Sequence, residues 1–371
     1  MRRFAVIMAG GSGERFWPAS RKERPKQLLR LTHPSSSMLE ESIERISPLI
    51  PPENIVIATS ETLAGPIKRA LPALRSENVL AEPAKRNTAA CLALAAAHLE
   101  AVYGDPTEIA MAVLTADHRI GQPDTFRATV DAALEFAEEE DALVTIGCEP
   151  DRPETGYGYI EIDVKVARST PVGPIHRVAR FREKPNAATA QTYCRSGKHL
   201  WNSGMFFWRV SSLLEGFARH MPALAAAIPE MRDSLGEHAA NPASRERLRA
   251  AFEPLEDVSI DVGLMERAGN VHVIRAGFPW DDVGAWDSLV RTREHDASGN
   301  VNAGDAILID SRDCIVYNEE GPERMGVAVI GLDDVIVATT KDGILVCRKD
   351  RAQDVRQVVK ALRARGLDRL T

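Results

Sequence analysis

Short apolar runs alternate with helical patterns along the first 150 residues. The apolar runs have the length of buried strands and lie at residues 4–9, 54–59, 78–83, 109–118 and 142–147. Runs of this kind are typical of strands that are buried on both faces of a parallel sheet. The helical patterns between them lie at residues 37–46, 61–71, 87–104 and 124–140. The alternation predicts an α/β fold with a doubly wound parallel sheet and right-handed crossovers.

Two of the helical patterns begin with residues that favour helix N-caps. Asn87 and Thr88 open one of them, and Asp124 opens another. Side chains of these types accept hydrogen bonds from the free N–H groups of a first helical turn. We therefore expect these three residues to cap their helices.

The pattern changes over residues 151–210. Longer strand-like stretches at 155–164 and 173–185 are followed by a helix and by a further strand at 200–210. This segment predicts an insertion that builds the second half of a cleft. Residues 211–270 read as mostly helical, and the stretch that follows returns to the main domain.

After about residue 297 the chain becomes rich in short β-branched runs. Asp, Gly and Asn turns separate them, no long helix interrupts them, and an amphipathic helix at 351–365 follows. The pattern predicts a small β-rich appendage with a closing helix. We expect a catalytic domain at 1–295, containing the 151–210 insertion as its sugar-binding part, and a C-terminal domain at 296–371.

Composition removes several function classes. The 371 residues carry a net charge of -7, whereas a nucleic-acid or anionic-membrane binder would need a broad basic face. The five cysteines are scattered and form no CxxC, so they indicate neither a disulfide framework nor a zinc finger. No apolar run approaches the roughly 20 residues that span a bilayer. We expect a cytoplasmic protein with no nucleic-acid or membrane partner.

The basic charge is concentrated behind the first apolar run. Gly10-Gly11-Ser12-Gly13 is followed by five cations, namely Arg15, Arg21, Lys22, Arg24 and Lys26. The loop fits neither the Walker A nor the Rossmann glycine pattern. Glycine and serine still let backbone N–H groups approach a phosphate, and cations supply the charge that amides lack. The loop predicts a polyphosphate site, the alternative being a tight turn that needs glycine.

The stretch GGSGERFWPASRKERPKQ at residues 10–27 resembles the signature of sugar-1-phosphate nucleotidyltransferases, in the form used by mannose-1-phosphate guanylyltransferases. The resemblance extends over nearly the whole chain. It continues through Glu82-Pro83, Arg86–Ala89, Thr115–His118, Glu154–Tyr159, Phe181 with Glu183–Pro185, Trp201–Met205, Ser259–Asp261, Met265-Glu266 and Trp280–Gly284.

The resemblance implies a fold and a reaction. The fold is a GT-A-like, Rossmann-like domain with a mixed or mostly parallel sheet, joined to a small left-handed β-helix-like domain. The reaction transfers GMP from GTP to mannose 1-phosphate, with Mg²⁺ as cofactor, and gives GDP-mannose and pyrophosphate. Relatives of this form are often dimers, so a homodimer is expected. The further domain of bifunctional isomerases has no counterpart here, so no isomerase activity is expected.

The same resemblance implies roles for charged residues. Asp117 and Asp282 are the expected Mg²⁺ ligands, with Asp281 as the competitor of Asp282. Arg15 and Lys26 are expected to contact the triphosphate, and Lys184 to hold the phosphate of the sugar. These five are the expected catalytic residues. His118 is expected to shape the loop rather than to bind metal.

Other residues are expected to bind the substrates. The nucleotide set is Gly10, Gly11, Ser12, Gly13, Arg15, Lys26, Glu82, Asn87, Thr88 and Asp117. The sugar-phosphate set is Gly156, Glu183, Lys184 and Asn202. Trp201 and Trp280 are expected to be core residues that position these motifs.

Some residues differ from those that are usual in the family motifs. Two other functions also stay open. Thr115 stands where proline is frequent, Val262-Gly263 where tyrosine and a small residue are usual, and Asp342-Gly343 where Asp-Ala is usual. None of these changes removes a charged candidate. The alternatives are the same chemistry with another nucleotide and sugar, such as glucose 1-phosphate, and a non-catalytic nucleotide-sugar sensor.

Overall fold

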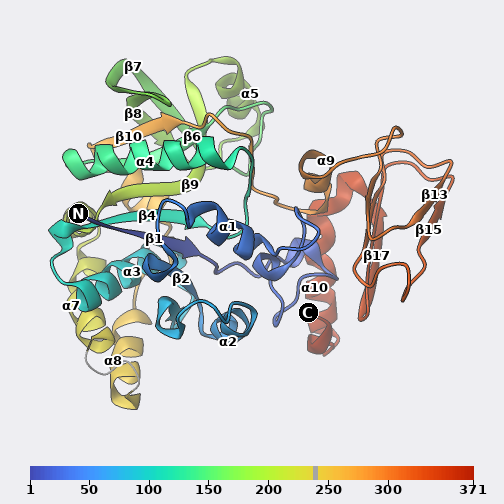
Figure 1. Ribbon diagram of the computed structural model, residues 1–371, viewed down its shortest axis with the longest axis horizontal. Coiled ribbons are helices and arrows are strands. Elements are labelled where there is room, and N and C mark those ends of the chain that lie inside the picture. Colours follow the sequence, from blue (N-terminus) through green and yellow to red (C-terminus); the bar gives the residue numbers. More distant parts are fainter. Residues whose placement is uncertain (237–240) are drawn as a thin grey trace.

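The computed structural model describes residues 1–236 and 241–371. A large α/β unit carries the N-terminus, and a smaller β-rich unit lies beside it, with helix α10 (Val355–Ala364) at their junction (Figure 1).

A nine-stranded mixed sheet forms the centre of the large unit within the described residues. In spatial order its strands are β3 (Val79–Glu82), β2 (Ile55–Ser60), β1 (Arg2–Met8), β4 (Ile109–Thr115), β9 (His199–Arg209), β6 (Leu143–Cys148), β10 (Val271–Arg275), β8 (Gly173–Arg182) and β7 (Tyr159–Thr170). The first four are parallel to one another, and β9 is antiparallel to both of its neighbours β4 and β6.

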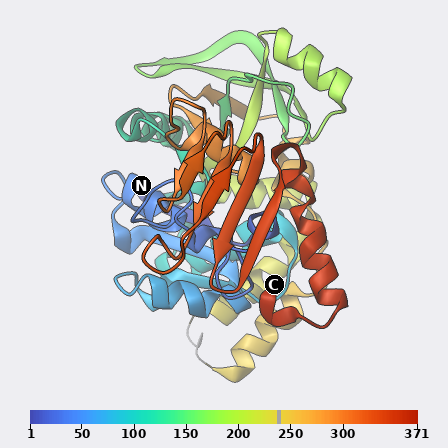
Figure 2. The ribbon, with the colours of Figure 1, turned by 90° about the vertical axis from the view of Figure 1, so that its right-hand side faces the viewer.

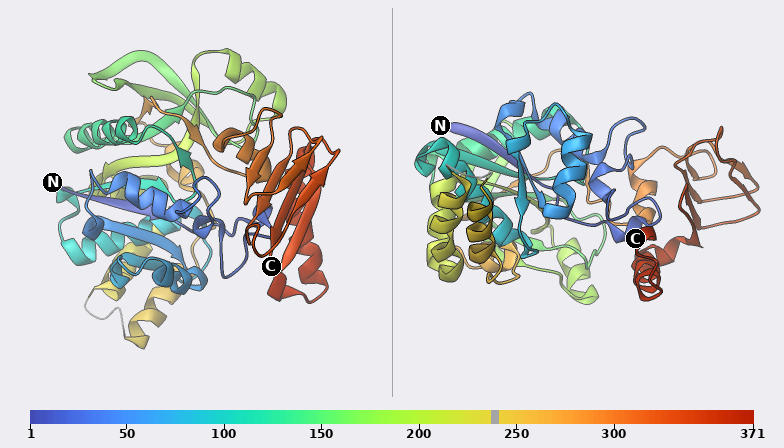
Figure 3. Two further views of the ribbon diagram at one scale, coloured as in Figure 1. Left: turned by 45° about the vertical axis from the view of Figure 1, so that its right-hand side comes forward. Right: turned by 90° about the horizontal axis from the view of Figure 1, so that it is seen from below.

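Helices cover both faces of this sheet (Figure 3). One face carries α3 (Asn87–Tyr103), α6 (Val210–His220), α7 (Pro222–Leu235) and α8 (Pro242–Phe252), and the other carries α1 (Met38–Ile46), α2 (Glu61–Ala70) and α4 (Pro123–Glu139). Along β1, Phe4 and Val6 join the first core, whereas Ala5 and Ile7 join the second. Burial on both faces explains why the strand sequences are unbroken apolar runs.

Strand β9 shows how the 151–210 segment enters the main sheet. Its residues come from the expected insertion, yet they lie between β4 and β6 at the centre of the sheet. The long hairpin of β7 and β8 lies at the sheet edge, and the short helix α5 (Ala187–Arg195) links it to β9 (Figure 1). Because β7 also pairs with β9, at Tyr159 and Trp201, two of the sequence motifs become neighbours.

The expected N-caps are wrong. Helix α3 is preceded by Arg86 without a side-chain cap, and Thr88 Oγ1 instead accepts a hydrogen bond of 2.8 Å from the Ile260 N–H. Helix α4 begins at Pro123, so Asp124 lies inside its first turn and pairs with Arg127. Proline suits a first helical position because it needs no N–H partner there. The N-cap positions are Arg86 and Gln122, one or two residues before the expected ones.

The β-rich unit is a coil of stacked strands. Its strands are β12 (Val301–Ala303), β13 (Ile307–Ile309), β14 (Ile315–Asn318), β15 (Ala328–Ile330), β16 (Val335–Thr340) and β17 (Gly343–Arg348). β12, β14 and β16 form one parallel stack, and β13 and β15 form a second. The chain thus alternates between two stacks, before β17 turns back along β16 and α10 follows (Figure 2).

One hydrophobic cluster joins this coil to the large unit. Phe16 and Trp17 from the N-terminal signature meet Trp286, which precedes α9 (Leu289–Thr292), and Tyr317 of the coil. Trp286 is fully buried, and its Nε1 donates a 3.0 Å hydrogen bond to the Trp17 carbonyl. The glycine-rich loop is therefore held between the two units.

Candidate active site

The glycine-rich loop leaves β1 at the carboxyl end of the parallel strands. Gly13 has a left-handed φ of 66°, and a Cβ there would collide with the side chain of Lys26. Ser20 Oγ donates to the Gly13 carbonyl at 2.6 Å, and Gln27 Nε2 donates to the Gly11 carbonyl at 2.9 Å. Glycine is needed at position 13 for both conformation and space. These contacts show the conformation of a tight turn at Gly13, and the polyphosphate site stays a prediction.

Lys26 lies at the centre of the candidate site. Its side chain is 7% exposed, and its Nζ donates to Asp117 Oδ2 at 2.9 Å and to the Asp282 carbonyl at 2.8 Å. The Lys26 ammonium thus contacts both expected metal ligands, while the Lys26 backbone and Cβ lie against Gly13 of the expected triphosphate loop. Three segments that are far apart in the sequence meet at this point.

A short strand pair brings the two aspartates together. β5 (Arg119–Ile120) follows Asp117, and β11 (Trp280–Asp281) precedes Asp282. The two strands pair antiparallel, with Asp281 opposite Arg119. This pairing places the end of β4 and the later Trp-Asp-Asp motif on one rim.

Asp281 and Asp282 have different surroundings. Asp281 is buried, and it accepts hydrogen bonds from Arg291 Nε at 2.6 Å and from the Val283 N–H at 2.8 Å. Asp282 lines a cavity and accepts a 2.5 Å hydrogen bond from the Tyr157 hydroxyl on Oδ1. The Asp281 carboxylate is committed to local structure, whereas Asp282 faces the cleft.

The Asp117 carboxyl is held in its ionised form. Burial opposes its ionisation, but the positive charges of Lys26, and further those of His118 and Arg15, outweigh burial and lower the pKa of Asp117. For His118 the dominant effect is burial, which lowers its pKa, and its Nδ1 accepts from Trp280 Nε1 at 3.1 Å. His118 therefore holds the local structure, as expected.

The two aspartates offer oxygen atoms to a hard cation. Within residues 1–236 and 241–371, no group donates a hydrogen bond to Asp117 Oδ1 or Asp282 Oδ2. In the same part of the chain no three His, Cys, Asp or Glu side chains form a metal-binding group. Two carboxylates suit Mg²⁺, which usually completes its shell with water and substrate phosphates.

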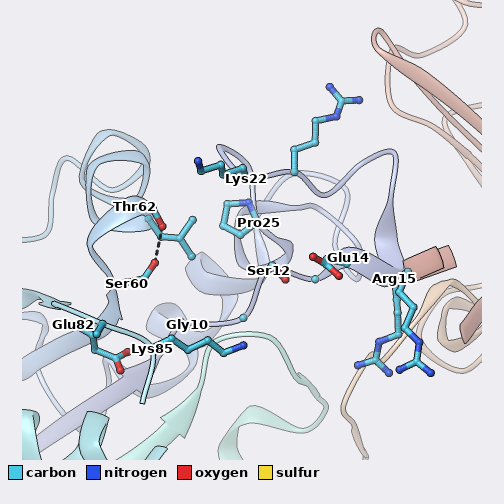
Figure 4. Close-up of a pocket in the computed structure, with 16 residues that line it drawn as sticks. Gly10, Ser12, Glu14, Arg15, Lys22, Pro25, Ser60, Thr62, Glu82 and Lys85 are labelled. Atoms are coloured by element: carbon cyan, nitrogen blue, oxygen red, sulfur yellow. Dashed lines mark hydrogen bonds between the residues drawn. The ribbon is translucent and has the colours of Figure 1, made fainter. Parts of the chain in front are cut away.

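The first cavity, of about 610 Å³, lies along the glycine-rich loop. Its lining includes Gly10, Gly11, Ser12, Gly13, Glu14, Arg15, Arg21, Lys22, Ser60, Thr62, Glu82, Lys85 and Arg356. Figure 4 shows Glu82 and Lys85 at one end, Gly10 and Ser12 in the middle, and Arg15 at the other end. Burial raises the pKa of Glu82 to about 7, so this carboxyl is weakly solvated.

The second cavity, of about 230 Å³, collects the expected sugar-phosphate residues. Gly156, Glu183, Lys184 and Asn202 all line it, together with Thr88 and Asp282. Three expected nucleotide residues, Lys26, Asn87 and Asp117, line neither cavity, and Asn87 is exposed at the start of α3. Lys26 contacts Asp282 of this cavity and packs against Gly13 of the first, so it lies between them.

Two residues of the second cavity were not predicted. Asn202 Nδ2 donates to Asp261 Oδ1 at 2.7 Å, and burial, with the nearby Glu183 charge, raises the pKa of Asp261 to about 6. Tyr157 holds Asp282 through its hydroxyl. Tyr157 and Asp261 both lie in stretches that resemble the family signature. Their place in these stretches is the sequence feature that could have identified them.

Lys184 has an unusual backbone conformation. Its φ is 43°, its side chain is 64% exposed, and its Nζ lies 3.0 Å from Glu183 Oε1. A lysine in the left-handed region is uncommon. The conformation keeps Lys184 and Glu183 together at the cavity.

Comparisons with known proteins agree with this arrangement. A nucleotidyl transferase family model matches residues 4–299, and a mannose phosphate isomerase/GMP-like β-helix model matches residues 304–362. A mannose-1-phosphate guanylyltransferase of Escherichia coli is 38% identical over 96% of this chain and 73% of the relative. The chain belongs to this family.

A second related protein and a solved structure support membership in this family. The xanthan biosynthesis protein XanB of Xanthomonas campestris is 37% identical over 99% of this chain and 74% of its own length. A solved structure from Thermus thermophilus, titled mannose-1-phosphate geranyltransferase, is 35% identical with a TM-score of 0.84, over 98% of this chain and 100% of that chain.

Family membership confirms the expected fold class of a nucleotidyltransferase domain with a C-terminal β-helix-like domain. It also confirms that the protein is a nucleotidyltransferase enzyme. In the described part of the chain no helix has the length and apolar character needed to cross a membrane.

Gly13 gives a test of how the loop of this family member is built. Gly13→Ala should lower the free energy of unfolding by about 1–2 kcal/mol because of the left-handed φ at this position. The collision of the new Cβ with Lys26 should add a further loss of stability. Gly197→Ala is the matched control, because Gly197 has a φ of 64° and open space around it. Urea unfolding of both variants measures the difference. Equal destabilisation would contradict the packing of Gly13 on Lys26.

Proposed function

We propose that this protein transfers GMP from GTP to α-D-mannose 1-phosphate. A phosphate oxygen of the sugar phosphate attacks the α-phosphorus of GTP and forms the new P–O bond. The bond from the α-phosphorus to the β-phosphate oxygen breaks, and pyrophosphate leaves with its electron pair. The products are GDP-mannose and pyrophosphate. The observation that carries the proposal is that Lys26 joins three segments between two cavities. Its ammonium contacts Asp117 and the Asp282 carbonyl, and its backbone and Cβ lie against Gly13 of the glycine-rich loop.

The reaction brings two anions together, so the residues must offset their repulsion. Lys26 and Arg15 are proposed to face the triphosphate, and Lys184 the phosphate of the sugar. The backbone of Gly10–Gly13 offers N–H groups on the first cavity. Fixed cations and amides stabilise phosphoryl transfer because they need little reorganisation as charge shifts. Asn202, Glu183 and Asp261 are suited to sugar hydroxyls, since an amide donates and accepts while carboxylates accept.

Asp117 and Asp282 are proposed to hold Mg²⁺. Their two free carboxylate oxygens and the adjoining cavities leave room for the substrate phosphates as further ligands. When bound, the cation supplies neutralisation of phosphate charge. Tyr157 orients Asp282 through its hydroxyl, and Lys26 keeps the two aspartates at one place in the absence of substrate.

Glu82 is proposed to read the guanine base. Guanine presents N–H donors at N1 and N2, and a carboxylate accepts from both. Glu82 lies at the end of the first cavity away from Arg15 (Figure 4), which leaves the loop between base and triphosphate. The weak solvation that raises its pKa also strengthens hydrogen bonds made to it.

A substrate panel tests the function. Purified protein should turn over GTP with mannose 1-phosphate faster than ATP, UTP or dTTP, and faster than GTP with glucose 1-phosphate, as measured by pyrophosphate release. Higher turnover with another pair would support the alternative transferase. Absence of turnover with every pair, alongside binding of GDP-mannose, would favour a nucleotide-sugar sensor.

Glu82→Gln should raise the KM for GTP about tenfold, because the amide replaces one acceptor by a donor. In the wild-type enzyme the KM for GTP should fall as pH rises through about 7, since the carboxylate form appears above that pKa. The variant cannot titrate there, and GTP's own ionisation is common to both proteins. A pH profile of KM that is identical in the two would exclude Glu82 from base recognition.

The neighbouring aspartates give a matched pair of variants. Asp282→Ala should reduce kcat by about a thousandfold or more, with little change in the urea midpoint, because this side chain faces the cavity. Asp281→Ala should lower the free energy of unfolding by about 2 kcal/mol, since Arg291 and the Val283 N–H lose their acceptor. Full activity of Asp282→Ala with Mg²⁺ would show that the wrong carboxylate was chosen.

Lys184→Ala should raise the KM for mannose 1-phosphate about tenfold and leave the KM for GTP nearly unchanged, since a charge-assisted contact is removed. Lys198→Ala, another exposed lysine of the same segment, is the control. A larger change in the GTP constant would reverse the assigned role.

A homodimer is proposed from the surface of the β-helix-like unit. Exposed apolar side chains occur on β13, β15 and β17, at Ile307, Ile309, Ile330, Ile344 and Val346, and at Leu332 just after β15. Exposed apolar surface can mark a protein interface. Sedimentation equilibrium should give twice the chain mass, and Ile330→Asp should shift it toward the monomer; a monomeric wild type would overturn the proposal.

A further inference from the structure

The end of the chain makes polar contacts with the glycine-rich loop. Arg363 of α10 lies 2.8 Å from Glu14, measured from Nη2 to Oε1. Arg15 Nη1 donates to Gln353 Oε1 at 3.0 Å, in the turn just before α10. Trp17 Nε1 donates to the Leu370 carbonyl at 2.8 Å. Three of the four residues from 14 to 17 thus contact the last twenty residues of the chain.

Arg356 brings the C-terminal unit into the first cavity. It is the second residue of α10, its side chain is exposed, and it lines the cavity together with the loop residues Gly10–Arg15. Across residues 1–236 and 241–371, no carboxylate forms an ion pair with Arg356. Arg356 lies far from the glycine-rich loop in the sequence, and no sequence motif predicted it as a site residue.

The charges on the cavity wall favour a polyanion. Five cations and two carboxylates line it, the cations being Arg15, Arg21, Lys22, Lys85 and Arg356, and the carboxylates Glu14 and Glu82. Arg21 is neutralised by Asp342, and Glu14 by Arg363. Of the remaining wall cations, Arg356 is the one supplied by the C-terminal unit.

The position of Arg356 along the cavity follows from its contacts. α10 packs against the Glu14–Phe16 turn, which lies at the Arg15 end of the cavity (Figure 4). If the base lies at Glu82, the outer phosphates of GTP point toward Arg15 and Arg356. An arginine can bind phosphate oxygens in two parallel hydrogen bonds.

We propose that Arg356 is a further binding residue for the β- and γ-phosphates of GTP, and for pyrophosphate in the reverse reaction. This inference rests on the proposed function. It makes the β-helix-like unit a part of the nucleotide site, with Gln353 positioning Arg15 and Arg356 contacting the ligand.

Isothermal titration of the full chain with GTP and with GMP, in Mg²⁺ buffer, tests the inference. Arg356→Ala should weaken GTP binding about tenfold and leave GMP binding unchanged, because GMP lacks the outer phosphates. Arg356→Lys should recover part of the loss, since it keeps the charge without the bidentate fork. Lys360→Ala removes an exposed cation from the same helix, outside the cavity lining, and should behave as the wild type.

Kinetics gives a second measurement. Arg356→Ala should raise the KM for GTP in the forward reaction and for pyrophosphate in the reverse reaction, with unchanged KM for mannose 1-phosphate and unchanged urea midpoint. Equal loss in Arg356→Ala and Lys360→Ala, or equal weakening of GTP and GMP, would overturn the inference.

The same titrations separate this inference from the proposed function. A wild type that binds GTP no more tightly than GMP would contradict a triphosphate site altogether. A wild type that prefers GTP, together with an unaltered Arg356→Ala, would refute the role of Arg356 and leave the guanylyltransferase proposal standing.

Discussion

The buried ammonium of Lys26 is the interaction on which the site depends. Removing a charge from water is costly, and only good partners offset that cost. Here the partners are the Asp117 carboxylate and the Asp282 carbonyl, at 2.9 and 2.8 Å. Loss of the Asp117 carboxylate would remove the negative charge that Lys26 contacts directly. The glycine-rich loop, the end of β4 and the end of β11 are therefore fixed relative to one another.

That constraint also explains why the loop sequence is so specific. Lys26 can reach both aspartates only because Gly13 has no side chain and a left-handed backbone, which lets the two segments touch. Trp17 holds the other end of the same loop, because its carbonyl accepts a hydrogen bond from Trp286 and its indole N–H donates to the Leu370 carbonyl. A glycine-rich segment, which would otherwise be mobile, gains a single conformation from packing on both sides.

The two cavities lie on parts of the fold with different origins. The cavity proposed for the nucleotide is built on the parallel strands β1, β2 and β3, whose carboxyl ends share one edge. The cavity proposed for the sugar phosphate is built on the start of β7, on β9 and on the Ser259–Asp261 stretch, whose Ile260 N–H donates to Thr88 Oγ1 of α3. Contact between the two sides passes through Asp282, which is held by Lys26 from one side and by Tyr157 from the other.

Local sequence determined the buried strands and most helices, because strand length, apolar periodicity and turn residues are properties of neighbouring residues. It also determined the loop chemistry, since three glycines and a cluster of cations are visible without a fold. The motifs contain Asp117, Asp282, Lys184 and Asn202. The last three line the second cavity, and Asp117 lies beside them at Lys26.

Only the tertiary structure decided which distant residues meet. The central position of β9, the β5–β11 pair, and the approach of α10 to the loop depend on long-range packing, which no local pattern records. The expected cap at Thr88 failed for the same reason, because its hydroxyl bonds to Ile260 rather than to its own helix. Tyr157, Asp261 and Arg356 became candidates through their neighbours in space, since the chemistry of a side chain depends on partners that the linear chain places far away.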